Sequence, residues 1–204
     1  MFASFVKQTP VLVPLLLLSA CDVGKDAPPP PQRFVSVEVQ PKAEAQRLCD
    51  TQFPAGGPQF QLPEGSIGDR ASAPSPIRSG HWTWINLWAT WCGPCREEMP
   101  LLHTWDGALD TPNRKLDVYF LSLDEEANPT ETFWNNNPEL AIHATARLPI
   151  RDGLGAFFKR YGLSEDAAIP VHLLVDPQGS VRCARGGSIS ESDLTAVKAV
   201  LSGM

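Results

Sequence analysis

The stretch that decides the fold is residues 81–100, which read His-Trp-Thr-Trp-Ile-Asn-Leu-Trp-Ala-Thr-Trp-Cys-Gly-Pro-Cys-Arg-Glu-Glu-Met-Pro. Within it, Trp82–Trp88 is an apolar and aromatic run with the length of a strand. The turn Cys92-Gly93-Pro94-Cys95 follows, and apolar residues at helical spacing then predict a helix to about Trp105. A strand that leads through a tight turn into a helix leaves both thiols in the first turn of that helix.

The start of a helix favours redox chemistry at a cysteine pair. Unpaired N–H groups and the positive end of the helix dipole stabilise a thiolate, so we expect the pKa of Cys92 to lie well below the usual value of about 8.5. Pro94 lacks an N–H that would have no partner there. The Cys92 thiolate would attack a disulfide, and Cys95 is close enough to resolve the mixed disulfide. The alternatives are half of a zinc site and a structural disulfide that never turns over.

The remaining pattern predicts an α/β fold with a central mixed sheet and helices on both faces. The strand–helix–strand order around the cysteine pair requires a crossover connection, and therefore a parallel, right-handed unit. A helix is expected to begin with Asn128 as its N-cap and Pro129 at its first position, Gly162 is expected to end a helix, and residues 176–179 to form a turn. The predicted strands are Phe34–Val39, Phe60–Leu62 (at an edge), Leu116–Leu123, Ala146–Ile150, Val171–Val175 and Ser180–Ala184, and the further helices are Pro41–Cys49, Asn128–Trp134, Leu154–Tyr161 and Glu191–Leu201.

The N-terminus predicts export. Residues 1–20 carry one lysine, Lys7, and an apolar run, Val11–Leu18, that is too short to span a membrane as a helix of about 20 residues. Leu18-Ser-Ala-Cys21 resembles the bacterial lipobox, and the resemblance implies that Cys21 becomes a lipid anchor. Ordinary secretion with cleavage after Ala20 is the alternative. Residues 21–57 then form the anchor, a proline-rich tether and an N-terminal extension, and residues 58–204 form the main domain.

The charge excludes one class of partner. The chain carries 17 Lys+Arg and 23 Asp+Glu, and removal of the leader with Lys7 leaves 16 − 23 = −7. An acidic chain of this kind offers no basic patch for nucleic acid or for anionic lipid. Attachment to a membrane would then depend on the lipid on Cys21.

The residues Trp88-Ala-Thr-Trp-Cys-Gly-Pro-Cys-Arg-Glu-Glu-Met-Pro100 resemble the TlpA/ResA/CcmG group of membrane-anchored bacterial thioredoxin-like proteins. The resemblance extends from about residue 58 to the end and implies a thioredoxin-like fold. It also implies that Pro170 is cis and that the backbone of Ile169 pairs with an extended peptide substrate. Trp91 is expected to shield the thiolate and shape the docking surface, next to Gly93 and Pro94 of the motif.

Two polar positions near the cysteines leave alternatives open. Asn86 stands where thioredoxin has a buried Asp, so deprotonation of Cys95 needs another group or water. Glu98, one helical turn from Cys95, is the nearest candidate in sequence. An ordinary solvated carboxylate is the other interpretation of Glu98. His172 either tunes the site or is a packed strand residue. The remaining histidines, His81, His103 and His143, show no metal spacing, and we expect no metal and no organic cofactor.

Cys49 and Cys183 are the two cysteines left once Cys21 is lipidated and Cys92 is paired with Cys95. In an oxidising compartment they are expected to form a structural disulfide between the N-terminal extension and a hairpin strand. A second redox pair and a four-cysteine zinc site are the alternatives.

The sequence therefore predicts a lipid-anchored thiol-disulfide oxidoreductase of the cell envelope, facing the periplasm or the cell exterior. Its partners would be disulfide-bearing exported proteins, for example in cytochrome c or copper-site maturation, and the resemblance implies a membrane thiol donor of the DsbD/CcdA type. The alternatives are an oxidant that forms disulfides and a binding or chaperone module without turnover. A peroxidase is disfavoured because the Pro-x-x-x-Thr/Ser-x-x-Cys pattern of peroxiredoxins does not precede Cys92.

Overall fold

A mixed sheet carries the functional residues. In the computed structural model, which describes residues 41–54, 57–68, 77–149 and 151–203, its seven strands follow the order β1-β7-β6-β3-β4-β5-β2. The central strand β3 pairs in parallel with β4 and antiparallel with β6. The strands are β1 (Thr51–Gln52), β2 (Ile67–Gly68), β3 (His81–Trp88), β4 (Lys115–Ser122), β5 (Ala144–Arg147), β6 (Val171–Val175) and β7 (Val181–Gly186). The expected leader 1–20, Cys21, the tether and the strand Phe34–Val39 lie outside the described residues.

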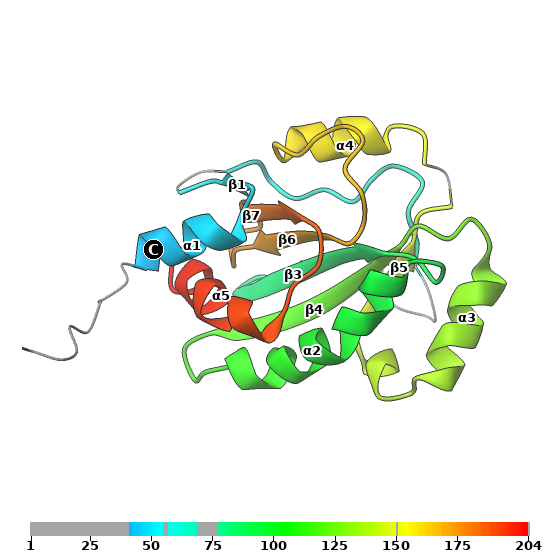
Figure 1. The fold of residues 1–204 in the computed structure, drawn as a ribbon, viewed down its shortest axis with the longest axis horizontal. Helices are drawn as coiled ribbons and strands as arrows, with labels where there is room; N and C mark the ends of the chain where they lie inside the picture. Colours follow the sequence, from blue (N-terminus) through cyan, green and yellow to red (C-terminus); the bar gives the residue numbers. More distant parts are fainter. Residues whose placement is uncertain (1–40, 55–56, 69–76, 150, 204) are drawn as a thin grey trace, which may run out of the picture. The chain divides into compact units, whose positions relative to one another are not determined.

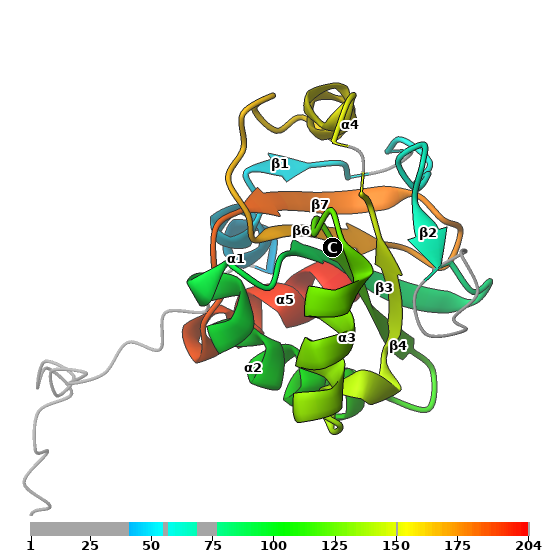
Figure 2. The same ribbon diagram turned by 90° about the vertical axis from the view of Figure 1, so that its right-hand side faces the viewer.

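Helices cover both faces of this sheet (Figures 1 and 2). On one face lie α2 (Gly93–Leu109), α3 (Ala127–Asn136) and α5 (Leu194–Leu201), and on the other lies α4 (Leu154–Arg160). Helix α1 (Pro41–Leu48) packs against α5, and the short 3-10 helices are η1 (Leu140–Ile142) and η2 (Glu191–Asp193). The predicted α/β fold with a mixed sheet and helices on both faces is confirmed.

Strand β3 is buried on both faces, which explains its nearly continuous apolar sequence. Side chains alternate along it, so Trp84, Asn86 and Trp88 share one face. Trp84 packs against Trp105 of α2 with ring centroids 5.8 Å apart, and Trp88 packs against Trp134 of α3 at 5.1 Å. Asn86 is thus the polar position of a face that is otherwise aromatic here, and it lies directly beneath α2.

The edge strand expected at Phe60–Leu62 is wrong. Phe60 is buried against Phe157 of α4 and Tyr161, with ring centroids 6.4 and 6.2 Å apart. Gln59 before it forms an isolated bridge to Ser180, and residues 60–62 form no strand. Pro58 and Pro63, which cannot donate to a ladder, flank it. The sheet edges are the two-residue strands β1 and β2.

Two predicted helix ends also move. Helix α2 continues past Trp105 to Leu109, because Leu109 is buried and extends the apolar face of the helix. Helix α3 begins at Ala127 with Glu126 at the N-cap, so Asn128 lies inside the first turn and is not the cap.

Candidate active site

The cysteine pair lies at the N-terminus of α2. Cys92 is the N-cap residue, and its Sγ accepts a hydrogen bond of 3.3 Å from the backbone N–H of Cys95. The two cysteines are joined in a disulfide. Cys92 is 6% exposed and Cys95 is fully buried, so the sulfur that a second protein can reach is that of Cys92. The helix N-terminus offers that sulfur both an N–H donor and the positive end of the dipole.

The loop before β6 lies against this sulfur. The Ile169–Pro170 peptide bond is cis, and the Ile169 carbonyl oxygen lies 3.8 Å from Cys92 Sγ. The Pro170 carbonyl accepts a hydrogen bond of 2.8 Å from the Gly187 N–H, which anchors the loop to the chain after β7. The backbone at Ile169 is therefore held beside the position where a substrate sulfur must arrive.

A largely apolar groove opens at Cys92. Its volume is about 440 Å³. It is lined by Trp91, Cys92, Gly93, Pro94, Leu123, Arg151, Leu154, Phe158, Ala167, Ala168 and Ile169. Trp91 is 60% exposed although it is a large aromatic residue, and it also borders a second, more polar hollow with Glu125 and Glu126. A surface of this kind suits an extended, partly apolar polypeptide.

Glu98 lies beneath the cysteine pair and is not a solvated carboxylate. It is 4% exposed and lies one helical turn after Cys95. Its Oε1 accepts a hydrogen bond of 2.9 Å from Asn86 Nδ2, and its Oε2 accepts one of 3.0 Å from the Ile189 N–H. His172, also buried, places Nε2 3.4 Å from Glu98 Oε1. The structure thus brings Glu98, Asn86 and His172 together, with Glu98 one helical turn from Cys95.

Sequence reasoning missed Asp124, which positions the loop before Cys92. Its carboxylate accepts hydrogen bonds from the Thr90 N–H at 2.9 Å, the Thr90 hydroxyl at 2.7 Å and the Ser122 hydroxyl at 2.6 Å. The carboxyl ends of the parallel strands β3 and β4 lie at the same sheet edge, so a polar residue just after β4 can hold the chain that leaves β3. The signal was Ser122-Leu-Asp124 at the end of a buried strand.

Two of the remaining histidines form a separate cluster with Asp106. His103 Nδ1 lies 3.0 Å from His143 Nε2, and His143 Nδ1 lies 3.8 Å from Asp106 Oδ2. Burial, together with the charge of His103, lowers the pKa of His143 to about 4. Burial raises the pKa of Asp106 to about 6, and the nearby Asp110 and Asp117 add to that rise.

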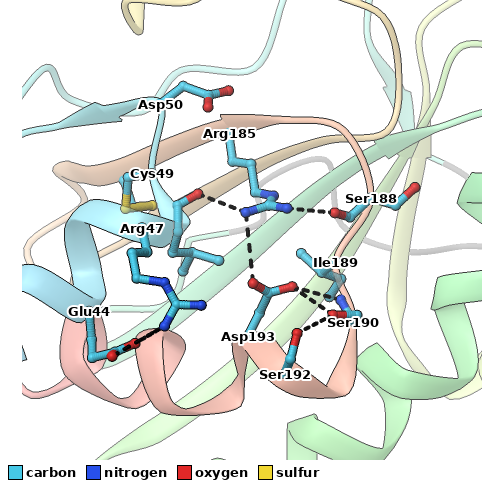
Figure 3. Close-up of polar contacts among 12 residues, drawn as sticks. Glu44, Arg47, Cys49, Asp50, Arg185, Ser188, Ile189, Ser190, Ser192 and Asp193 are labelled. Atoms are coloured by element: carbon cyan, nitrogen blue, oxygen red, sulfur yellow. Dashed lines mark hydrogen bonds and ion pairs between the residues drawn. A yellow bond between two sulfur atoms is a disulfide. The ribbon is translucent and has the colours of Figure 1, made fainter. Parts of the chain in front are cut away.

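Cys49 and Cys183 are joined in a disulfide that connects the end of α1 to β7. Figure 3 shows the polar contacts around it: the Arg185 guanidinium donates to the Leu48 carbonyl at 3.1 Å and to the Ser188 carbonyl at 2.8 Å, and it lies 3.9 Å from Asp193. Within the described ranges, no group of three or more His, Cys, Asp or Glu side chains could hold a metal ion. None of the helices in the described part of the chain combines the length and apolar character that a membrane crossing requires.

Comparison with known proteins decides the family. The family model described as AhpC/TSA family matches residues 56–184, which is more than half of the chain. The chain belongs to the AhpC/TSA family. The match includes the cysteine pair, Glu98, the Ile169–Pro170 loop and most of the sheet.

One solved structure supports the fold, and two others are similar in part. A protein from Chlorobium tepidum, assigned as a thiol:disulfide interchange protein DsbE, is 20% identical and superposes with a TM-score of 0.50, covering 61% of this chain and 81% of that chain. A thioredoxin-related protein from Neisseria meningitidis serogroup B is 28% identical with a TM-score of 0.49, covering 62% and 88%. StoA from Bacillus subtilis is 20% identical with a TM-score of 0.43, covering 58% and 82%.

Family membership and the site define the chemistry. A Cys-x-x-Cys disulfide stands at the N-terminus of α2, with its outer sulfur at the N-cap and at the mouth of a groove. This AhpC/TSA family member is a thioredoxin-like thiol-disulfide oxidoreductase, and the resemblance to the TlpA/ResA/CcmG group is confirmed at the level of family and fold. Disulfide-bearing proteins are the class of partner that fits this chemistry.

Proposed function

We propose that this protein is a lipid-anchored, extracytoplasmic reductase of disulfides in exported proteins. The observation that carries the proposal is the position of Cys92 Sγ, which lies at the helix N-cap, next to the Ile169 carbonyl and at the mouth of the apolar groove. Cytochrome c or copper-site maturation is the setting that the resemblance to the TlpA/ResA/CcmG group suggests. The Leu18-Ser-Ala-Cys21 motif supports the lipid anchor and a location in the cell envelope, with the domain facing the periplasm or the cell exterior.

In the reduced protein, the first step is attack by the Cys92 thiolate. Its sulfur forms a bond to one sulfur of the substrate disulfide, and the other substrate sulfur leaves as a thiolate. The Cys95 N–H and the helix dipole stabilise the attacking charge. The substrate chain lies along the groove, and the backbone at Ile169 is available to hold it in an extended conformation.

The second step needs a proton acceptor inside the protein. Cys95 must lose its proton before its sulfur can attack Cys92 and release the substrate as a second thiolate, which solvent protonates. Cys95 is fully buried, so water reaches it poorly, and the Glu98 carboxylate one turn along the same helix is the acceptor we assign. Two electrons pass from the dithiol to the substrate, and the protein finishes with the Cys92–Cys95 disulfide.

A reductase must then be reduced again. We propose a membrane thiol donor of the DsbD/CcdA type, because a domain outside the cytoplasm has no direct access to cytoplasmic reductants. The Gly-Pro dipeptide between the cysteines is similar to reducing thioredoxin, whose potential is about −270 mV, rather than to the oxidant DsbA, at about −120 mV.

The deciding experiment is the reduction potential of the Cys92–Cys95 pair, obtained by equilibration with glutathione and dithiothreitol buffers. We expect a value at or below about −220 mV. A value near −120 mV would make the protein an oxidant and would refute the proposed direction. The Cys49→Ala/Cys183→Ala variant is the matched control that assigns the measured potential to the active-site pair.

Three further measurements separate this proposal from its rivals. Cys92→Ser and Cys95→Ser variants should lose the biological effect, and retention would indicate a binding or chaperone module. Hydrogen peroxide should be consumed no faster than by a free dithiol, and rapid turnover would indicate a peroxidase. Cys21→Ser should abolish incorporation of a labelled fatty acid and release the protein from the membrane fraction; an unchanged distribution would refute the lipid anchor.

A further inference from the structure

We infer that His172 is a positioning residue for Glu98: it is held in the tautomer that carries its proton on Nε2, and that N–H orients the Glu98 carboxylate one helical turn from Cys95 and stabilises its negative charge. This inference rests on the proposed role of Glu98 as the acceptor of the Cys95 proton. It assigns His172 of β6 and Trp84 of β3 a role in the second step, the attack of Cys95 on the mixed disulfide.

The tautomer follows from the donors that face the ring. Trp84 Nε1, which can only donate, lies 3.1 Å from His172 Nδ1. Asn86 Nδ2 lies 3.3 Å from the same nitrogen. The orientation of the Asn86 amide is fixed, because its Nδ2 also donates to Glu98 Oε1 at 2.9 Å. A flipped amide would instead turn the Asn86 Oδ1 toward the Glu98 carboxylate. Two N–H groups therefore point at Nδ1, which must offer its lone pair, and a neutral ring carries its proton on Nε2.

That proton lies on the side of Glu98. Nε2 of His172 is 3.4 Å from Glu98 Oε1, within ion-pair distance but outside hydrogen-bond geometry, and it has no hydrogen-bond partner among the described residues. With His172, Asn86 and the Ile189 N–H, Glu98 faces N–H groups from three different segments: β6, β3 and the chain before η2. These contacts orient the carboxylate and stabilise its negative charge.

In the described part of the chain, the imidazole meets donors at Nδ1 and lies in a buried setting. Trp84, Asn86, Glu98 and His172 are all nearly or fully buried. Protonation of Nδ1 would place an N–H against the Trp84 N–H. Arg185 of the neighbouring strand β7 lies opposite His172 in register, and its guanidinium lies 3.9 Å from Asp193 of η2 (Figure 3). From α2, the titratable groups on this side are Cys92, Cys95 and Glu98 itself.

Loss of the His172 N–H should affect only the resolving step, in which Cys95 attacks the mixed disulfide. Glu98 can accept the Cys95 proton only while it is ionised. Removal of the His172 N–H makes the carboxylate easier to protonate, so the step should fail at a higher pH than in the wild type. Attack by Cys92, which uses the N-cap and the helix dipole, should not change.

The reaction of the reduced protein with 5,5′-dithiobis(2-nitrobenzoate) separates these steps by stopped flow. The first phase releases one thionitrobenzoate as Cys92 attacks, and the second releases another as Cys95 resolves the mixed disulfide. In His172→Leu, we expect the acid limb of the second phase, the pH range in which its rate falls as the pH decreases, to move about one pH unit higher. Such a move corresponds to a roughly tenfold loss of rate below the limb. The first phase should keep its wild-type profile.

Two variants test the donor role. His172→Gln can again present an N–H to Glu98 without titrating, and it should restore the wild-type profile. Trp84→Phe removes the donor that holds Nδ1, and it should shift the second phase in the wild type but not in the His172→Leu background. An unmoved second phase in His172→Leu, an equal shift of both phases, or a Gln variant that behaves like Leu would each overturn the inference.

Glu98→Gln distinguishes this failure from that of the proposed function. Loss of the acid limb in Glu98→Gln together with an unmoved limb in His172→Leu would leave the proposed function standing and refute the role of His172. If the rate of the second phase in Glu98→Gln still falls at low pH as it does in the wild type, Glu98 is not the acceptor, and this inference is refuted with it. Absence of both phases in the reduced wild-type protein would refute thiol-disulfide exchange itself.

Discussion

Replacement of Asp106 by asparagine should stabilise the protein at neutral pH. Burial, reinforced by Asp110 and Asp117, raises the pKa of Asp106 from 3.8 to about 6, so the charged form is disfavoured in the folded state. A rise of about two pKa units corresponds to about 3 kcal/mol. Because the Asp106 side chain is 29% exposed, solvent screening reduces the expected gain in the free energy of unfolding to about 1–2 kcal/mol.

The sign of the pH dependence is part of this prediction. Below pH 3.8, Asp106 is protonated in both the folded and the unfolded chain, and asparagine resembles that form. As the pH rises through about 6, the folded wild type must ionise a disfavoured carboxylate and loses stability, whereas Asp106→Asn does not. The difference between the two proteins should therefore be small at pH 4 and reach its full size by pH 7.

Asp110→Asn is the matched control, with the opposite sign. Partial burial raises the pKa of Asp110, but hydrogen bonds of 2.8 Å from Lys115 Nζ and from the Leu116 N–H outweigh it, and the pKa is lowered. Its charged form is thus favoured, and the variant should lose up to about 1 kcal/mol at pH 7.

The assay is urea unfolding of the oxidised protein, followed by tryptophan fluorescence at pH 4 and pH 7. A less stable Asp106→Asn at pH 7 would contradict the reasoning, and so would a gain of the same size at both pH values. The first result would mean that the carboxylate has favourable partners, and the second that the effect does not come from ionisation.

Three further predictions concern the disulfide, the loop before Cys92 and the groove. Removal of both Cys49 and Cys183 as alanines should lower the free energy of unfolding by roughly 3–5 kcal/mol, because the disulfide closes a loop with a sequence separation of 134; a loss below about 1 kcal/mol in urea unfolding would contradict this. Asp124→Ala leaves the Thr90 N–H and hydroxyl without their acceptor, so thermal unfolding should show a loss of about 2–3 kcal/mol, against little change for an exposed control, Glu126→Ala. Trp91→Ala should reduce kcat/KM for a protein disulfide about tenfold and leave the reduction potential unchanged, because an aromatic anchor at an interface contributes about 1–2 kcal/mol; a shifted potential would show instead that Trp91 tunes the thiolate.

Local residue order determined a large part of this protein. The apolar run of β3, the Cys-Gly-Pro-Cys turn and the helical spacing after it depend on neighbours in the chain, because steric limits, helix capping and alternation of side chains act over a few residues. The same holds for the turn after β6, where the Asp176 carboxylate accepts from the N–H groups of Gln178 and Ser180 and Gly179 has a positive φ. These features could be predicted without a structure.

Tertiary structure alone decided the environment of the reacting sulfurs. Glu98 could be a solvated or a buried residue from its sequence, and its burial comes from Asn86 on β3, His172 on β6 and Ile189 before η2. The loop before Cys92 is fixed by Asp124 after β4. Residues 60–62 form no edge strand, and Phe60 packs instead against the aromatic rings of Phe157 and Tyr161. Each of these contacts joins segments far apart in the chain, and their energy depends on burial and on which donors meet which acceptors. Spacing along the sequence contains no information on such pairings, and so the chemistry of the second cysteine became visible only in the folded molecule.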